Sequence, residues 1–303
     1  MTAAAFSGMR VLVTGSASHL AQALLPMLCE HASVAHVTGI DLRPTGWQHP
    51  KLVARQIDLT RSDPQDWLSG HDAFIHLAWV VLRGHMALAR MRAINIEASK
   101  HWLSAAAQAG LPRIIHLSSA SVYGHGEMLT ETAPLTPLPG FCYAEHKTEI
   151  EHWLEQRWPS IMRLRPHIIL GPHAQPLLHA ILRLPVYPVF PDPQPQLQCV
   201  HEQDVARAIL LALTQPFEGA CNLAAPGSFS LRDAIVAHRP HALGIPPGVA
   251  AFGLRWLWRL SGIGGETGWF DGAQHSLTLD CSRARDVLDW QPKISIASML
   301  AAP

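Results

Sequence analysis

Two short stretches decide the fold of this chain: Arg113-Ile-Ile-His-Leu-Ser-Ser-Ala-Ser-Val-Tyr-Gly124 and, further on, Tyr143-Ala-Glu-His-Lys147. The first is typical of a short apolar strand that ends in two serines, and the second of the start of a helix. A tyrosine and a lysine four residues apart share one helix face and can act on one atom. We therefore take Tyr143 and Lys147 as the first candidates for chemistry. The alternative is an exposed pair on a surface helix.

Strand-like and helical patterns alternate through the first two-thirds of the chain. Continuous apolar strands separated by helices imply a parallel sheet covered on both faces, so the expected fold class is α/β with a doubly wound sheet. The expected strands are residues 10–14, 34–41, 52–58, 73–77, 113–118 and 161–165. The expected helices are residues 19–30, 64–69, 86–109 and 143–157.

The composition of the sequence changes at Gly171, where proline-rich segments typical of loops begin. We expect a nucleotide-binding core domain at 1–170 that also takes 197–225, where a segment returns to the core. Residues 171–196 and 226–303 are then expected to form a small substrate-binding lobe. Within it, residues 250–260 predict an aromatic, partly amphipathic helix, which we interpret as a packed lobe helix or a lid; a peripheral membrane anchor is the alternative.

Composition excludes several classes of protein. With 48% hydrophobic and 15% charged residues, the 303-residue chain is typical of a globular protein. Lys+Arg and Asp+Glu balance at 23 each, so no net field favours nucleic acid or an anionic membrane. Five dispersed cysteines without a C-x-x-C indicate free thiols, and no export signal or membrane-spanning run is seen. We expect a cytoplasmic protein with no metal site.

The order of these motifs over about 200 residues resembles the extended branch of the short-chain dehydrogenase/reductase superfamily, the NAD-dependent epimerase/dehydratase family. The resemblance extends through residues 280–292, which look like the family's C-terminal helix. It implies a Rossmann-type sheet that binds NAD(P), a small-molecule substrate, and a homodimer formed by helices 86–109 and 143–157. The apolar stripes that favour such a dimer are Leu88, Met91, Ile94, Ile150, Trp153 and Leu154.

The first strand and helix are joined by a turn that departs from the family pattern. The family usually has Thr-Gly-x-x-Gly-x-x-Gly; this chain has Gly15, Ser18 and Ala21 at the three glycine positions. The second glycine normally lets the backbone approach the pyrophosphate, so the Cβ of Ser18 is expected to crowd the cofactor. Alternatively, its hydroxyl caps the helix or binds phosphate.

Asp41 ends the second strand, where the resemblance places an acid that accepts hydrogen bonds from the adenosine ribose. It favours NAD over NADP, although Arg43 could accommodate a 2′-phosphate. Residues implied at the cofactor are Gly15, Ser18, His19, Leu20, Asp41, Leu42, Asp58, Leu59, Leu77, Ala78, Asn95, Tyr143, Lys147 and Pro166.

The resemblance gives Tyr143 the role of general acid/base, with Lys147 lowering its pKa and holding the nicotinamide ribose. Ser119 would donate to the substrate oxygen; Ser118 is the alternative. Residues implied at the substrate are Trp79, Ser119, Ser121 and His167.

The reaction subtype is less defined by the sequence. Sugar 4,6-dehydratases have Asp-Glu where this chain has Ala120-Ser121, and epimerases often have Asn where it has Ile168. Few cations are available for a diphosphate apart from Arg183 and Arg207. We expect an NAD(P)-dependent oxidoreductase or epimerase that acts on a nucleotide sugar or on a smaller or more apolar alcohol or carbonyl. The alternative is a non-catalytic, dinucleotide-binding regulatory protein.

Overall fold

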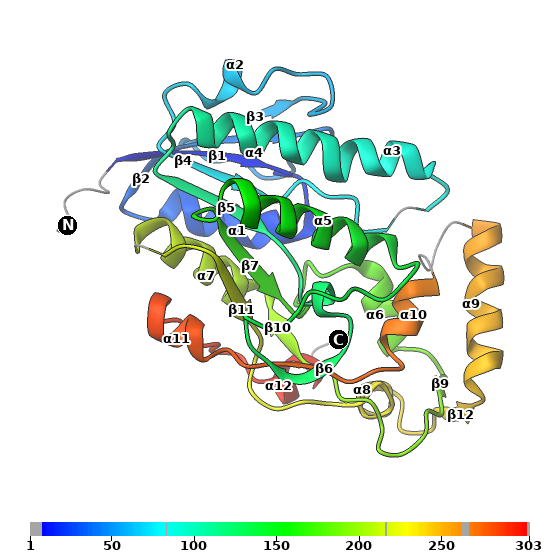
Figure 1. The fold of residues 1–303 in the computed structure, drawn as a ribbon. Coiled ribbons are helices and arrows are strands. Elements are labelled where there is room, and N and C mark those ends of the chain that lie inside the picture. Colours follow the sequence, from blue (N-terminus) through cyan, green and yellow to red (C-terminus); the bar gives the residue numbers. More distant parts are fainter. Residues whose placement is uncertain (1–7, 83, 216, 262–266, 302–303) are drawn as a thin grey trace.

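The computed structural model describes residues 8–82, 84–215, 217–261 and 267–301. Its centre is a parallel sheet of seven strands in the order β3-β2-β1-β4-β5-β7-β11 (Figure 1). These strands are β1 (Met9–Thr14), β2 (Val34–Asp41), β3 (Leu52–Gln56), β4 (Ala73–His76), β5 (Arg113–Leu117), β7 (Met162–Pro166) and β11 (Ala220–Leu223). The α/β, doubly wound fold class is therefore confirmed. The first six strands lie where the sequence predicts them, with ends shifted by one or two residues, whereas β11 was not among the predicted strands.

Helices cover both faces of the sheet, which is why β4 and β7 are buried along their whole length. On one face lie α1 (His19–Glu30), α7 (Glu202–Thr214) and α11 (Ser282–Leu288). On the other face lie α2 (Gln65–Leu68), α4 (Ser99–Gln108) and α5 (Cys142–Arg157).

The single helix expected at residues 86–109 is divided into three parts. α3 (Leu88–Arg92) passes into a π-helical segment, η2 (Ala93–Ala98), before α4 begins. The wide turns of η2 hold Asn95 fully buried, and its amide clamps the backbone of Val80. A π-helical turn inside a helix often serves to place one side chain in this way.

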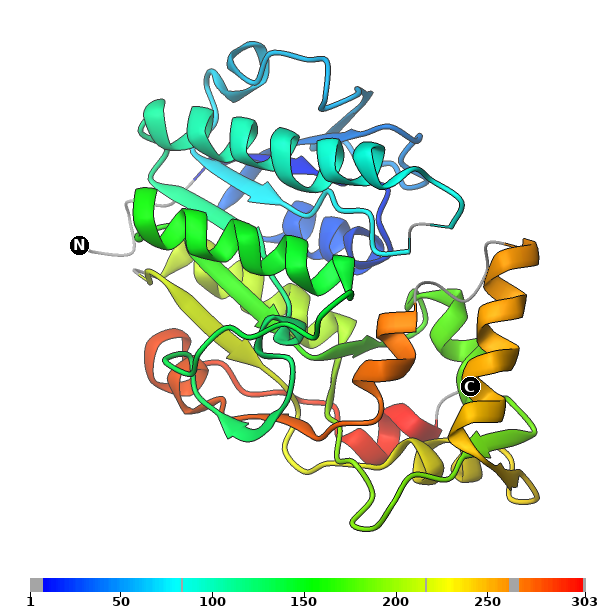
Figure 2. The ribbon, with the colours of Figure 1, turned by 45° about the vertical axis from the view of Figure 1, so that its right-hand side comes forward.

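The remaining elements are short pairs of parallel strands and several helices outside the seven-stranded sheet (Figure 2). The strand pairs are β8 (Ile168–Leu170) with β10 (Cys199–His201), β9 (Val186–Pro188) with β12 (Leu243–Ile245), and β6 (Gly126–Leu129) with β13 (Leu277–Leu279). The helices are η3 (Ala120–Tyr123), α6 (Pro176–Leu182), α8 (Leu231–His238), α9 (Pro247–Ser261), α10 (Thr267–Gly272) and α12 (Ile296–Ala301). Within the range 226–303, α11 lies apart from these, because Ala284, Leu288 and Trp290 pack into the core beside α1 and α7.

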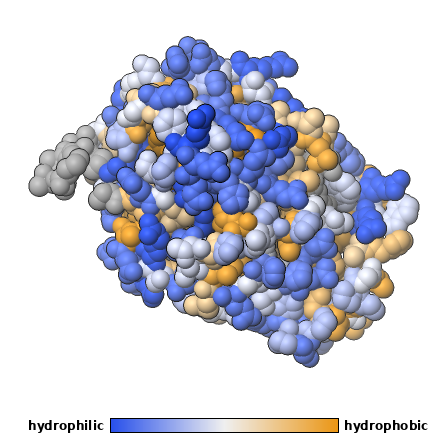
Figure 3. Space-filling view, viewed as in Figure 1, coloured by the Kyte–Doolittle hydropathy of each residue, from blue (hydrophilic) through white to orange (hydrophobic). Residues whose placement is uncertain are grey.

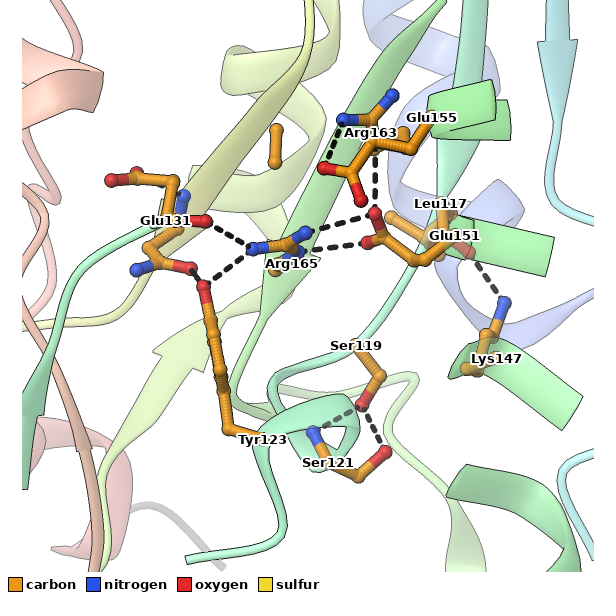
Figure 4. Close-up of polar contacts among 12 residues, drawn as sticks. Leu117, Ser119, Ser121, Tyr123, Glu131, Lys147, Glu151, Glu155, Arg163 and Arg165 are labelled. Atoms are coloured by element: carbon orange, nitrogen blue, oxygen red, sulfur yellow. Dashed lines mark hydrogen bonds and ion pairs between the residues drawn. The ribbon is translucent and has the colours of Figure 1, made fainter. Parts of the chain in front are cut away.

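A buried charge cluster ties α5 to the sheet (Figure 4). Glu151 of α5 is fully buried and accepts hydrogen bonds from Nε and Nη2 of Arg165 at 2.8 and 2.9 Å, while Nε of Arg163 lies 2.8 Å away. Arg165 also donates to the Tyr123 hydroxyl, which donates to Asn222 on β11. Burial opposes ionisation of Glu151, but the hydrogen bonds and charge of Arg165 and the charge of Arg163 outweigh it and lower the pKa of this carboxyl. The cluster thereby holds α5 in register with β7.

The apolar side chains that predicted a dimer interface are largely buried within the single chain. Met91, Ile150 and Leu154 are buried, and the latter two belong to the core under α5, whereas Leu88 is exposed. The homodimer therefore stays a prediction that rests on the resemblance. Among the described residues, no helix is long and apolar enough to cross a membrane.

Candidate active site

A cleft of about 1050 Å³ opens at the carboxyl ends of the central strands. Its core side consists of the loops that follow β1, β4, β5 and β7. The chain runs outward from β1 to β3 and then crosses back to β4, so β1 and β4 form the point where strand order reverses. Connections leave such a point in opposite directions and create a crevice, which explains why the cleft lies here.

Tyr143, Lys147 and Ser119 all line this cleft. Tyr143 and Lys147 lie one turn apart on α5, and Ser119 follows β5 as the N-cap of η3. Its Oγ accepts hydrogen bonds from the backbone N–H of Ser121 at 3.2 Å and from the Ser121 hydroxyl at 3.0 Å (Figure 4). The structure thus brings the expected catalytic residues together. Ser118, the alternative to Ser119, also borders the cleft but is buried.

The charges at the catalytic residues differ from those expected. Burial raises the pKa of Tyr143, and a side-chain hydrogen bond with Ser119 opposes the rise. Lys147 donates to the carbonyl of Leu117 and lies with Nζ 3.6 Å from the centre of the Trp79 ring. Burial lowers the Lys147 pKa well below its ordinary value, and the charge of Glu151 opposes this. Trp79 was predicted to lie at the substrate. It lines the cleft, and its ring packs against the Lys147 ammonium group.

The turn after β1 has the shape that a phosphate-binding turn needs. Gly15 has φ of +80°, and a Cβ there would lie 2.6 Å from the backbone nitrogen of Ala78. Ser18 is the N-cap of α1 and accepts from the N–H of Ala21 at 3.3 Å. Ser18, His19 and Leu20 line the cleft, so the positive end of α1 borders it. These features fit a dinucleotide pyrophosphate.

Asp41 and Arg43 are coupled to each other and to this turn. The Asp41 carboxylate accepts from the N–H of Ala17 at 3.0 Å and from the N–H of Arg43 at 2.9 Å. The Arg43 guanidinium donates to the carbonyl of Ala17 at 2.8 Å and lines the cleft, whereas Asp41 does not. Both residues are therefore fixed beside the turn that follows β1.

Several expected cofactor residues lie behind the cleft surface and support it. Asn95 accepts from the N–H of Val80 at 2.8 Å and donates to its carbonyl at 3.1 Å, which fixes the loop after β4. Asp58 binds Thr60 and Arg90, and Leu59 belongs to the core. The expected residues outside the cleft lining are Asp41, Leu42, Asp58, Leu59, Ala78, Asn95 and Gly15, and those within it include Leu77 and Pro166.

His167 lines the cleft, but its ring has structural partners. Nδ1 accepts from the N–H of Ile168 and Nε2 faces the carbonyl of Leu277, each at 2.8 Å. Burial lowers its pKa to about 4, with the Leu277 hydrogen bond in opposition, so the ring is neutral at pH 7. His167 was predicted to lie at the substrate, and a hydrogen bond from its ring to a substrate would require one of these contacts to break.

Helix α10, near the end of the chain, contacts the site, and no sequence pattern predicts this contact. Trp269 of α10 packs against Tyr143 with ring centres 5.1 Å apart and against Phe141 edge-on at 4.8 Å. Gly268 permits this approach, because a Cβ there would lie 2.6 Å from the Phe141 side chain. Since more than 100 residues separate these segments, no local pattern could predict the contact.

Helix α9 forms the outer wall of the cleft, at the right-hand edge of Figures 1 and 2. Leu254, Leu257 and Trp258 line the cleft, while Phe252 and Leu260 are exposed. Apolar atoms accordingly reach the surface on this side of the molecule (Figure 3). The helix predicted at residues 250–260 thus forms one wall of the cleft. A lid over the substrate would occupy the same position.

Comparisons with known proteins agree with this geometry. Residues 11–224 match the sequence model described as the NAD dependent epimerase/dehydratase family. The chain is 28% identical over 230 residues to an uncharacterised protein of Mycobacterium tuberculosis, and the match covers 74% of this chain and 22% of that protein. The chain thus spans about a fifth of the length of this relative. It is also 30% identical over 156 residues to a 3-beta-hydroxysteroid dehydrogenase of Mycolicibacterium neoaurum, covering 48% of this chain and 42% of the other.

Solved structures with the same fold include two epimerases. One is the UDP-glucuronic acid 4-epimerase from Bacillus cereus with UDP-glucuronic acid and NAD, with a TM-score of 0.75, 20% identity and 97% of each chain covered. The other is the UDP-glucose 4-epimerase from Thermotoga maritima with UDP-glucose, with a TM-score of 0.74, 20% identity, and 97% of this chain and 96% of that chain covered. At such identity the likeness establishes the fold alone.

Proposed function

The chain belongs to the NAD-dependent epimerase/dehydratase family, and from this premise we propose that it transfers a hydride between NAD and a substrate hydroxyl or carbonyl carbon. One observation carries the proposal: Tyr143, Ser119 and the N-terminus of α1 border the same cleft. A general acid/base and a dinucleotide-binding turn would thus hold the substrate and the cofactor in the same cleft. The names of the similar proteins include sugar epimerases and a hydroxysteroid dehydrogenase, so they leave the substrate class open.

The chain's own residues would divide the work as follows. The N–H groups at the α1 N-terminus would hold the pyrophosphate, Asp41 the adenosine ribose, and Lys147 the nicotinamide ribose. NAD, when bound, supplies the hydride acceptor and a positive charge beside the phenol. Ser119 would donate a hydrogen bond to the substrate oxygen and fix its position.

Tyr143 would take the proton from a substrate hydroxyl, or return it to a carbonyl. A phenol of pKa near 10 must be lowered by roughly three units to act at neutral pH, which is about 4 kcal/mol. Burial adds to this requirement, since it raises the Tyr143 pKa in the structure. We propose that the Lys147 ammonium, drawn away from Leu117 and Trp79 toward the cofactor, supplies the opposing charge.

The test is Tyr143→Phe, which removes only the ionisable oxygen. Turnover should fall by two or more orders of magnitude, while NAD affinity and the unfolding midpoint stay close to those of the unmodified protein. Tyr187→Phe is the matched control, because Tyr187 lies on β9 and does not line the cleft. Undiminished turnover in Tyr143→Phe would refute the mechanism. NAD binding without turnover of any alcohol, ketone or sugar nucleotide would favour the non-catalytic, regulatory alternative.

A further inference from the structure

The lobe side of the cleft carries little charge. Among the described residues, the Asp, Glu, Lys and Arg side chains that line the cleft are Arg43, Lys147, Glu202, Arg255 and Asp271. Arg43 and Lys147 lie on the cofactor side. Glu202 is buried and paired with His173 at 2.7 Å, so a substrate would meet one further cation, Arg255, and one carboxylate, Asp271.

This balance is unfavourable for a nucleoside diphosphate, whose two phosphates require cations or clustered N–H donors. The two arginines that the sequence offered for that purpose lie elsewhere. Arg183 borders a separate hollow with His179, His201 and His238. Arg207 is paired with Asp204 at 2.8 Å and donates to the carbonyl of Gln291. Neither lines the main cleft.

Polar and apolar groups are separated within the cleft. The hydroxyls of Ser119, Ser121 and Tyr143 gather at the ends of β5 and the start of α5. The opposite wall is hydrocarbon and aromatic, with Leu178 and Ile181 from α6, and Leu254 and Trp258 from α9. A site with a few convergent polar groups and apolar walls suits a ligand with one oxygen and a hydrocarbon body.

We propose that the substrate is an apolar secondary alcohol, or the corresponding ketone, whose hydrocarbon body lies along α6 and α9. This inference rests on the proposed function. In the oxidative direction, the C–H bond of the carbinol carbon breaks and its electron pair leaves as hydride to NAD⁺, while the hydroxyl proton passes to the Tyr143 oxygen. The alcohol becomes a ketone and NAD⁺ becomes NADH, so atoms and electrons balance.

A chain-length series tests the proposal. NADH formation is followed with 2-hexanol, 2-octanol and 2-decanol, and with UDP-glucose as the polar comparison. Burial of each methylene should raise kcat/KM about fourfold, or about 15-fold for each two-carbon step. A flat or falling series, or a higher kcat/KM for UDP-glucose, would overturn the substrate class while leaving the hydride-transfer function intact.

Two variants of α9 locate the hydrocarbon body. Leu254→Asp places a carboxylate in the cleft wall and should lower kcat/KM for 2-decanol at least tenfold through KM, with NAD affinity unchanged. Leu260→Asp makes the same change on the exposed face and should leave kcat/KM unaltered, because Leu260 is 76% exposed and outside the cleft lining. Equal effects of the two substitutions would count against the proposed position.

A binding measurement separates failure of the inference from failure of the proposed function. Calorimetric titration with 2-decanone in the presence of NAD⁺, and with UDP-glucose in the presence of NADH, forms non-productive complexes and so measures binding without turnover. Tighter binding of 2-decanone, weakened by Leu254→Asp, would support the apolar site even if no hydride transfer occurred. Tighter binding of UDP-glucose, or no binding of 2-decanone, would overturn it.

Discussion

Removing the charge of Glu151 should strongly destabilise the protein, because two buried arginines depend on it. The side chains of Glu151, Arg165 and Arg163 are 0%, 1% and 4% exposed. Glu151→Gln keeps the volume but leaves the Arg165 guanidinium facing a neutral amide, while Arg163 keeps Glu155 at 3.5 Å. Breaking a buried ion pair from one side costs about 3–5 kcal/mol, since the remaining charge stays buried without compensation. A typical domain has only about 5–15 kcal/mol of stability, so the loss would be severe.

Glu149→Gln is the matched control on the same helix. Glu149 accepts hydrogen bonds from Arg92 and Lys100, which lower its pKa to about 2. Its side chain is 33% exposed, however, so solvent screens these charges and the loss should stay within about 1 kcal/mol. Urea unfolding followed by circular dichroism measures both variants, and for Glu151→Gln the midpoint should fall by about 1 M or more. Losses that agree within about 1 kcal/mol would refute the argument that burial decides the cost.

Three further predictions concern the cofactor site and pH. Asp41→Ala should reduce the preference for NAD over NADP more than it reduces total binding, and tighter NADP binding by the unmodified protein in calorimetry would show that Arg43 dominates. Ser18→Gly should tighten NAD binding and, by removing the α1 cap, cost a few tenths of a kcal/mol in stability; weaker binding would identify the hydroxyl as a phosphate ligand. Burial, with the charge of Lys147, lowers the pKa of His76 to about 3, so below about pH 6.5 the unfolded chain takes up the proton first. The His76 contribution is present above that pH and is lost as pH falls toward 3, so stability in urea should be lower at pH 5 than at pH 7 by about 2 kcal/mol or more; equal stability would contradict this.

The sheet could be predicted from the sequence because β1, β2, β4 and β5 are largely apolar runs separated by helical patterns. Such runs require burial on both faces, and helices between them fix parallel pairing. The strand β11 (Ala220–Leu223) is equally buried, but Asn222 interrupts its apolar run, so its pattern does not distinguish it from a loop. The candidate catalytic pair could be identified for a similar reason, since Tyr143 and Lys147 are neighbours on one helix and their proximity depends only on local geometry.

By itself, therefore, the sequence determined the α/β sheet, the turn at Gly15, and the position of Tyr143 and Lys147 one turn apart on one helix. Tertiary structure alone decided what surrounds them, because contacts between distant segments leave no periodic trace in the chain. The packing of Trp269 on Tyr143, the platform of Trp79 beneath Lys147, and the apolar wall of α9 all arise in this way. Tertiary packing also places Arg183 and Arg207 outside the cleft. The cleft therefore lacks the positive charge that a diphosphate would need.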